Sequence, residues 1–226
     1  MQQANASTVP TSTSIIVSGF PRTGTTTMMR MLHYSGLEAI ADAITCDVAM
    51  SEFAPYGSYE LEHVGVALAK HKPSWTAGKV IKVVAPYVHW LSLTDRPLKV
   101  VFMLRDETEI ISSLLAMRVM WSHEPTETIR VARQYLEGGG VPILYVQYHD
   151  MVKYPRATAL RIQDFLGDEF VLDIAKAVTA VDRKPRERVK GVRIKEDEAE
   201  RLLRFNDYVV VEDVDKVEVQ QIANSK

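Results

Sequence analysis

The chain has 226 residues, of which 46% are apolar and 25% charged, and its net charge is -2. This size and composition indicate one sizeable globular domain, and the charge excludes a bulk basic field for nucleic acid or anionic membrane. Cys46 is the only cysteine, so an intrachain disulfide is excluded and a reducing compartment is expected. No apolar run approaches the ~20 residues of a membrane span, so we expect a cytoplasmic protein.

The two ends of the chain differ in composition from its middle. Residues 1–13 lack the basic and apolar regions of a signal peptide and are predicted to be a disordered leader. Residues 14–226 are predicted to form a single domain, because no linker long enough to separate a second domain interrupts them. Within that domain, residues 191–226 are expected to be a C-terminal extension whose packing the sequence does not determine.

Strand and helix patterns alternate through the middle of the chain. A short β-branched run over 14–18 predicts the first strand, and apolar residues at helical spacing over 25–36 predict the first helix. Gly36 is a typical helix stop. The other expected elements, in chain order, are a helix over 60–72, a strand over 78–86, a short helix over 87–94, a strand over 98–106, helices over 107–121 and 126–140, a strand over 141–150, a helix over 155–167 and one or two edge strands within 208–223.

This alternation predicts the α/β fold class, as a three-layer α/β/α P-loop fold with a central parallel sheet. The run over 98–106 is the most apolar in the chain. A strand that is apolar on both faces is typical of a parallel sheet covered by helices on both sides. We therefore expect this strand near the middle of the sheet.

The loop after the first strand, SGFPRTGTTT over 18–27, has the glycine spacing of a nucleotide-binding P-loop, but Thr25 stands where the lysine belongs. Such a loop turns backbone N–H groups inward, and the helix N-terminus adds its positive dipole end. The missing lysine argues against ATP or GTP hydrolysis. It favours a 5′-phosphate that carries one further leaving group, clamped by Arg22. The hydroxyls expected to donate to phosphate are those of Thr23, Thr25, Thr26 and Thr27.

The motif PRTGTTT over 21–27 resembles the phosphosulfate loop of the PAPS-dependent sulfotransferases, a family that includes bacterial sulfotransferase-like P-loop proteins. The family also has an Arg, with a Ser eight residues later, that together hold a 3′-phosphate, and Arg105 and Ser113 are similar to this pair. The family usually has a Pro two residues after the Arg, where this chain has Glu107. Further segments that are similar, within a resemblance covering 14–190, are YGSYELE, GKVIKVVAP and VQYHDMVKYPRATALRIQDFLG.

The resemblance implies a sulfotransferase that moves a sulfuryl group from PAPS (3′-phosphoadenosine 5′-phosphosulfate) to a hydroxyl or amine of a small-molecule or glycan acceptor. The product would be 3′,5′-ADP, and no metal is required. It implies that PAPS contacts Arg22, Thr23, Gly24, Thr25, Thr26, Thr27, Arg105 and Ser113, and that Arg22, Lys82 and Glu60 are catalytic. For the general base, Glu60 is the first choice, Glu52 the second, and His89 a third. The basic run over 183–195 is a candidate for a further anion contact.

Other interpretations of these residues stay open at this point. A P-loop kinase or phosphotransferase would need Mg²⁺ and an acid ending a strand, and Asp106 is in that position. A non-catalytic nucleotide-binding protein with the same fold is the third possibility, because fold alone does not establish activity. Arg105 and Asp106 could instead form a strand-end salt bridge, and Lys82 could face solvent. We expect a monomer or homodimer without nucleic-acid or membrane partners.

Overall fold

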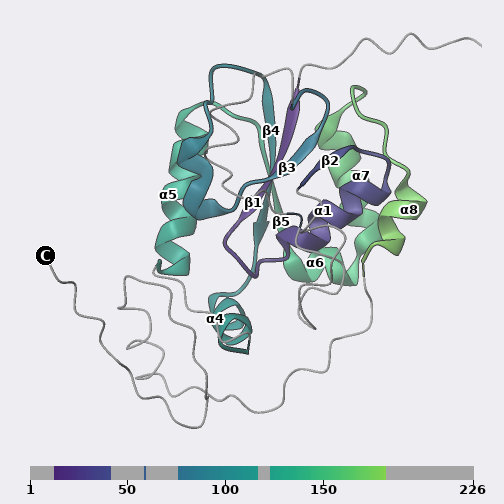
Figure 1. Ribbon diagram of the computed structural model, residues 1–226. Coiled ribbons are helices and arrows are strands. Elements are labelled where there is room, and N and C mark those ends of the chain that lie inside the picture. The colour runs from purple at the N-terminus through teal and green to yellow at the C-terminus, as the bar shows by residue number, and fades with distance from the viewer. Residues whose placement is uncertain (1–12, 42–58, 60–75, 117–122, 182–226) are drawn as a thin grey trace, which may run out of the picture.

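The computed structural model describes residues 13–41, 59, 76–116 and 123–181 (Figure 1). Its sheet has five parallel strands in the order β2-β3-β1-β4-β5. The strands are β1 (Ser14–Gly19), β2 (Ala39–Ile40), β3 (Val80–Lys82), β4 (Leu98–Leu104) and β5 (Ile143–Gln147). The helices are α1 (Thr25–Tyr34), the 3₁₀ helix η2 (Ala85–Trp90), α4 (Glu107–Ala116), α5 (Pro125–Gly138), α6 (Tyr148–Lys153), α7 (Pro155–Leu166) and α8 (Ile174–Thr179).

Two helical layers cover the sheet, as Figure 1 shows, with α1, α6, α7 and α8 on one face and η2 and α5 on the other. The alternation of side chains along β1 fills both cores. Ile15 and Val17 are fully buried in the cluster with α1, whereas Ile16 is fully buried in the cluster with η2 and α5. Each such side chain contributes about 1.5–3 kcal/mol of burial free energy. The predicted α/β fold with a central parallel sheet is therefore confirmed.

Most of the expected elements lie close to their predicted bounds. The strand expected over 78–86 is shorter in the structure, where it is β3 over Val80–Lys82. Val84 is still extended, but η2 begins at the next residue and has a proline in its first turn. Sequence reasoning missed β2, α6 and α8, which have two, six and six residues. Residues 1–12 of the predicted leader, the helix expected over 60–72 and the extension over 191–226 lie outside the described residues. Among the described helices, none is both long and apolar enough to cross a membrane.

The central strands β1 and β4 are hydrogen-bonded neighbours, from Ser14 opposite Leu98 to Gly19 opposite Met103. The chain after β1 continues into α1 on one face, while the chain after β4 continues through α4 to α5 on the other face. In open α/β sheets, ligands bind at the carboxyl ends of neighbouring strands whose connections diverge in this way. The glycine loop and the start of α4 both lie at this edge of the sheet (Figure 1).

Candidate nucleotide-binding site

The loop after β1 has a backbone that only a few residue types adopt. Gly19, Arg22 and Gly24 have positive φ angles of 138°, 76° and 95°. A Cβ on Gly19 would lie 2.6 Å from the carbonyl oxygen of Met103, and one on Gly24 would lie 2.5 Å from the ring of Tyr148. Both glycines are therefore required by close packing as well as by φ.

The loop leads directly into the N-terminus of α1. Gly24 is the N-cap residue, and no side chain caps the helix. The first N–H groups of any helix lack intrahelical acceptors, and they carry the positive end of the helix dipole. A tetrahedral anion is a suitable acceptor for these groups, as the sequence predicted for this loop.

The four threonines of the loop differ in their surroundings. The hydroxyl of Thr23 donates to the carbonyl oxygen of Phe20 at 2.7 Å, and its side chain is fully buried. This hydrogen bond closes the turn of the loop itself, and the expected contact of Thr23 with a phosphate stays a prediction. Thr25 is also buried, while Thr26 and Thr27 are half-buried at the start of α1.

Phe20 holds the loop against α4. Its side chain is fully buried and packs with Ile110 and Leu114 of α4, with Ile129 of α5 beside them. The buried residues of this small cluster belong to neither large core of the sheet, although Ile129 also packs against the core beneath η2 and α5. The small cluster sets the position of α4 relative to the loop, and hence the position of Ser113.

Arg22 connects the two anion sites that the sequence predicted. Its Nε donates to Ser113 Oγ at 2.9 Å, and its carbonyl oxygen accepts from Arg105 Nη1 at 2.9 Å. These partners are 91 and 83 positions away along the chain. A positive φ is strained for a residue with a side chain, and such strain persists where the surroundings hold both ends of the residue. Arg22 meets this condition.

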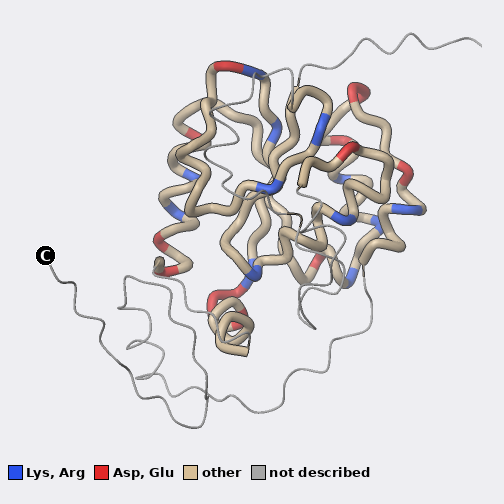
Figure 2. The backbone as a smooth tube through the Cα atoms, viewed as in Figure 1, with Lys and Arg blue, Asp and Glu red and all other residues tan. Residues whose placement is uncertain are grey.

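The guanidinium of Arg105 is held by neighbours from several elements. Its carbon lies 4.3 Å from the ring centroid of Tyr148, and its Nε donates to Glu109 Oε2 at 2.9 Å. Figure 2 shows basic and acidic segments meeting where β4 passes into α4. The sequence left open a salt bridge between Arg105 and Asp106, but Arg105 pairs with Glu109. Asp106 instead accepts the backbone N–H of Thr108 at 2.9 Å, and the hydrogen bond from the Thr108 hydroxyl lowers the pKa of Asp106.

Lys82 reaches the loop from the neighbouring strand. Its partner in the sheet register is Val17 of β1, and its side chain is only 4% exposed. Its Nζ donates to Thr26 Oγ1 at 3.2 Å. Lys82 therefore does not face solvent; it places an ammonium group beside the start of α1, in a loop that lacks the P-loop lysine.

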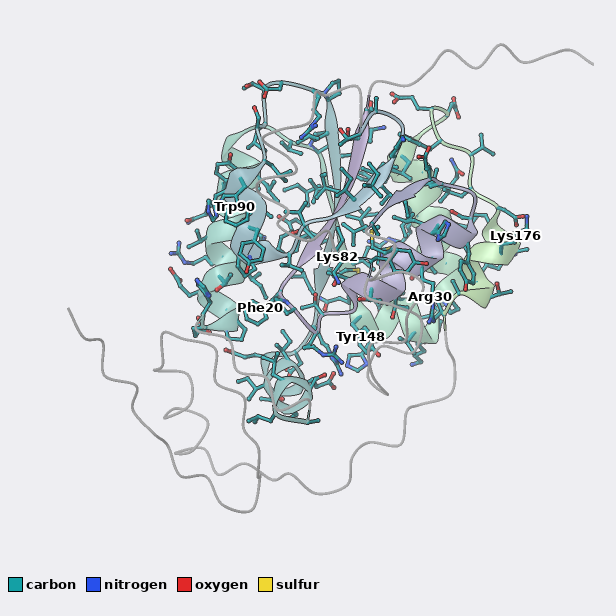
Figure 3. All side chains as sticks on the ribbon, in the orientation of Figure 1. Phe20, Arg30, Lys82, Trp90, Tyr148 and Lys176 are labelled. Atoms are coloured by element: carbon teal, nitrogen blue, oxygen red, sulfur yellow. The ribbon has the colours of Figure 1, made fainter. Side chains whose placement is uncertain are left out.

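The candidates for the general base are placed as follows. Glu60 and Glu52 lie outside the described residues, as does the basic run over 183–195. His89 is exposed in η2, with its ring edge-on to Trp90 at 5.6 Å between centroids. In Figure 3, Trp90 lies in the layer of η2 and α5, away from Lys82 and Tyr148. The assignment of a base stays a prediction.

Phe20, Glu109 and Tyr148 were given no role by sequence reasoning, although each holds part of this site. Tyr148 had a signal, because it directly follows a predicted strand and lies in a segment similar to a family motif. Phe20 lies inside the glycine loop, where a buried aromatic side chain has no sequence signature. Within the described part of the chain, no group of three or more His, Cys, Asp or Glu side chains could hold a metal ion.

No protein-family model and no curated protein matches this chain. Among solved structures, it is similar to retinol dehydratase in complex with androsterone and the inactive cofactor PAP, at 15% identity over 77% of this chain and 65% of that one, with a TM-score of 0.41. A sulfotransferase of Mycobacterium tuberculosis is 18% identical over 76% of this chain and 72% of that one, with a TM-score of 0.41. The sulfotransferase domain of the Synechococcus olefin synthase is 19% identical over 85% and 84%, with a TM-score of 0.43. This chain thus spans just under two thirds of the length of retinol dehydratase.

Proposed function

We propose that this chain binds PAPS and transfers its sulfuryl group to a hydroxyl or amine of a small-molecule or glycan acceptor. The observation that supports this proposal is the contact of Arg22 with both Ser113 and Arg105, at 2.9 Å each. A nucleotide with a 5′-phosphosulfate and a 3′-phosphate needs two adjacent anion sites. The loop before α1 is suited to one of them, and Arg105 before α4 with Ser113 on that helix is suited to the other.

The donors at these positions suit the two ends of such a nucleotide. The uncapped start of α1 suits the 5′-phosphate. At the other end, Arg105 has five N–H groups, as every arginine does, and its bonds to Glu109 and Arg22 use two of them. The remaining N–H groups of its terminal nitrogens are suited to a 3′-phosphate, together with the hydroxyl of Ser113.

When PAPS is bound, it supplies an activated sulfuryl group attached to its 5′-phosphate. As the acceptor oxygen or nitrogen bonds to sulfur, the bond from sulfur to the phosphate oxygen breaks, and negative charge collects on that oxygen. We infer that Arg22, Lys82 and the N–H groups of the loop stabilise this charge, since preorganised donors act most strongly where charge develops. The acceptor proton goes to a base, for which Glu60 is our first candidate, with Glu52 and His89 as the others.

Lys82 also bears on the choice between sulfuryl and phosphoryl transfer. In P-loop nucleotide hydrolases, the hydroxyl after the lysine binds Mg²⁺. Here the corresponding hydroxyl, on Thr26, accepts a hydrogen bond from Lys82 Nζ at 3.2 Å. A divalent cation at that hydroxyl would be repelled by the ammonium group. This favours metal-independent sulfuryl transfer over a Mg²⁺-dependent kinase.

Thermal unfolding with 3′,5′-ADP, ATP and 5′-AMP, each with and without Mg²⁺, tests the proposal. A ligand at 100 times its dissociation constant stabilises the protein by about 2.7 kcal/mol. We expect the largest shift from 3′,5′-ADP without metal, whereas stabilisation by Mg·ATP alone would contradict the proposal. Formation of 3′,5′-ADP from PAPS with a panel of acceptors then separates an enzyme from a non-catalytic binding protein.

A matched pair of serines on α4 provides a control. Ser113→Ala removes the hydroxyl that accepts from Arg22, so we expect weaker binding of 3′,5′-ADP. Ser112→Ala removes the neighbouring hydroxyl, which is exposed and donates to the carbonyl oxygen of Thr108 within the same helix. Equal affinities of the two variants for 3′,5′-ADP would argue against a 3′-phosphate site at Ser113.

A further inference from the structure

Glu109 lies between two basic side chains at the proposed 3′-phosphate site. Its Oε2 accepts from Arg105 Nε at 2.9 Å, and both of its carboxylate oxygens lie 3.0 Å from His149 Nε2. The three residues come from the end of β4, from α4 and from α6. The side chain of Glu109 is 28% exposed and that of His149 is 61% exposed. Water can therefore reach the contact between Glu109 and His149.

This carboxylate is an obstacle to an anion on Arg105. A phosphate bound to the terminal nitrogens of Arg105 would share one guanidinium with Glu109, at a separation where like charges repel appreciably. Partial burial raises the pKa of Glu109, but the hydrogen bond and charge of Arg105, together with His149, hold it below its usual value. Glu109 is therefore ionised at neutral pH, when a nucleotide would bind.

We propose that Glu109 competes with the 3′-phosphate of the nucleotide for Arg105, and that protonation of His149 weakens this competition. This inference rests on the proposed function, because it assumes a nucleotide with a 3′-phosphate. An imidazolium at His149 offsets the charge of Glu109 and leaves Arg105 more available to the phosphate. The competition also loosens the product 3′,5′-ADP, which carries the same 3′-phosphate.

Other charged and titratable groups lie close to Glu109 and His149. Asp106 is close enough that His149 contributes to the lowering of its pKa, although the hydrogen bond from Thr108 is the larger cause. The ring of Tyr148 stands edge-on to that of His149, at 5.6 Å between centroids, and its face lies against Arg105. Arg22 contributes its carbonyl oxygen to Arg105. The ligand also titrates, since the second pKa of a phosphate monoester is about 6.

The decisive variant is Glu109→Gln. Its amide oxygen can still accept from Arg105 Nε, so the arginine stays positioned while the negative charge is removed. For a partly exposed charge, we expect the Kd of 3′,5′-ADP at pH 8 to fall about threefold to fivefold, while the Kd of 5′-AMP stays the same. Isothermal titration calorimetry measures both, and 0.5 M salt should reduce the difference because it screens the repulsion.

Glu38→Gln is the matched control. Glu38 pairs with Lys79 at 2.6 Å, at the amino ends of the strands, so this variant removes one carboxylate charge far from Arg105. We expect it to leave the Kd of 3′,5′-ADP unchanged. An equal tightening in both variants would mean that the effect is one of net charge, and would overturn the inference.

His149→Gln tests the second half of the inference. The Kd of 3′,5′-ADP is measured at pH 8 and at pH 6.5 in the unsubstituted protein and in His149→Gln. On going to pH 6.5, the Kd of the unsubstituted protein should fall relative to that of His149→Gln. This difference should vanish when both proteins also carry Glu109→Gln. If 3′,5′-ADP binds but Glu109→Gln leaves its Kd unchanged or raises it, this inference alone fails. If no variant binds 3′,5′-ADP, the proposed function fails, and this inference with it.

Discussion

Replacing Arg105 by Ala should weaken binding of 3′,5′-ADP much more than binding of 5′-AMP. The two ligands differ only in the 3′-phosphate, so the comparison isolates the part of the site that Arg105 is proposed to form. The structure also gives Arg105 a second role, because its Nη1 donates to the carbonyl oxygen of Arg22 at 2.9 Å. Some loss of affinity should therefore be common to both ligands.

The two contributions have different sizes. The hydrogen bond to the Arg22 carbonyl oxygen has a charged donor but a neutral acceptor, and it acts on the ligand only through the loop, so we expect it to contribute about 0.5–1.5 kcal/mol and both ligands to lose about twofold to tenfold. Hydrogen bonds between an arginine and a phosphate are charge-assisted and contribute about 1.5–3 kcal/mol. Since 1.4 kcal/mol is about tenfold in affinity, 3′,5′-ADP should lose a further tenfold to hundredfold.

Calorimetric Kd values for both ligands at fixed salt measure this ratio. Arg130→Ala is the matched control, since it removes an arginine that pairs with Glu127 on α5 and is 52% exposed. We expect that control to leave both Kd values unchanged. Equal losses of 3′,5′-ADP and 5′-AMP in Arg105→Ala would refute the reasoning, because they would show that Arg105 only supports the loop.

Three other substitutions test the remaining parts of the site. Lys82→Met keeps the buried aliphatic part of the side chain but removes the ammonium group. The single-turnover rate of sulfuryl transfer from PAPS should therefore fall about tenfold to hundredfold. An unchanged rate would exclude Lys82 from the chemistry. Gly24→Ala should abolish 3′,5′-ADP binding, because its Cβ would lie 2.5 Å from a tyrosine ring, whereas Gly140→Ala, also at positive φ but in open space, should retain binding in the same titration. Phe20→Ala should lower the free energy of unfolding by about 3–5 kcal/mol in urea, and a loss as small as that of the exposed control Val171→Ala would contradict its anchoring role.

Local pattern was sufficient for the elements that are long and strongly apolar. The strand over Leu98–Leu104 was predicted because it is an unbroken apolar run, and the helix over Pro155–Leu166 because apolar residues recur along it at helical spacing. The strand Ala39–Ile40 has two residues, too few to show a period, and it forms only because β3 pairs with it. The order of the strands is likewise a property of the whole sheet, which no single segment encodes.

The sequence by itself determined the glycine loop and its placement between a strand and a helix, because few residues other than glycine adopt the backbone angles of such a loop. The choice of Arg105 and Ser113 as a 3′-phosphate site came from the resemblance of the sequence to the PAPS-dependent sulfotransferases. The tertiary structure decided what each side chain does. It committed the Thr23 hydroxyl to the Phe20 carbonyl oxygen, turned Lys82 toward Thr26, and placed Glu109 on Arg105. The physical reason is that these contacts join positions far apart in the chain or hidden within a turn, so packing of β1, β4 and α4 has to bring them within hydrogen-bond distance.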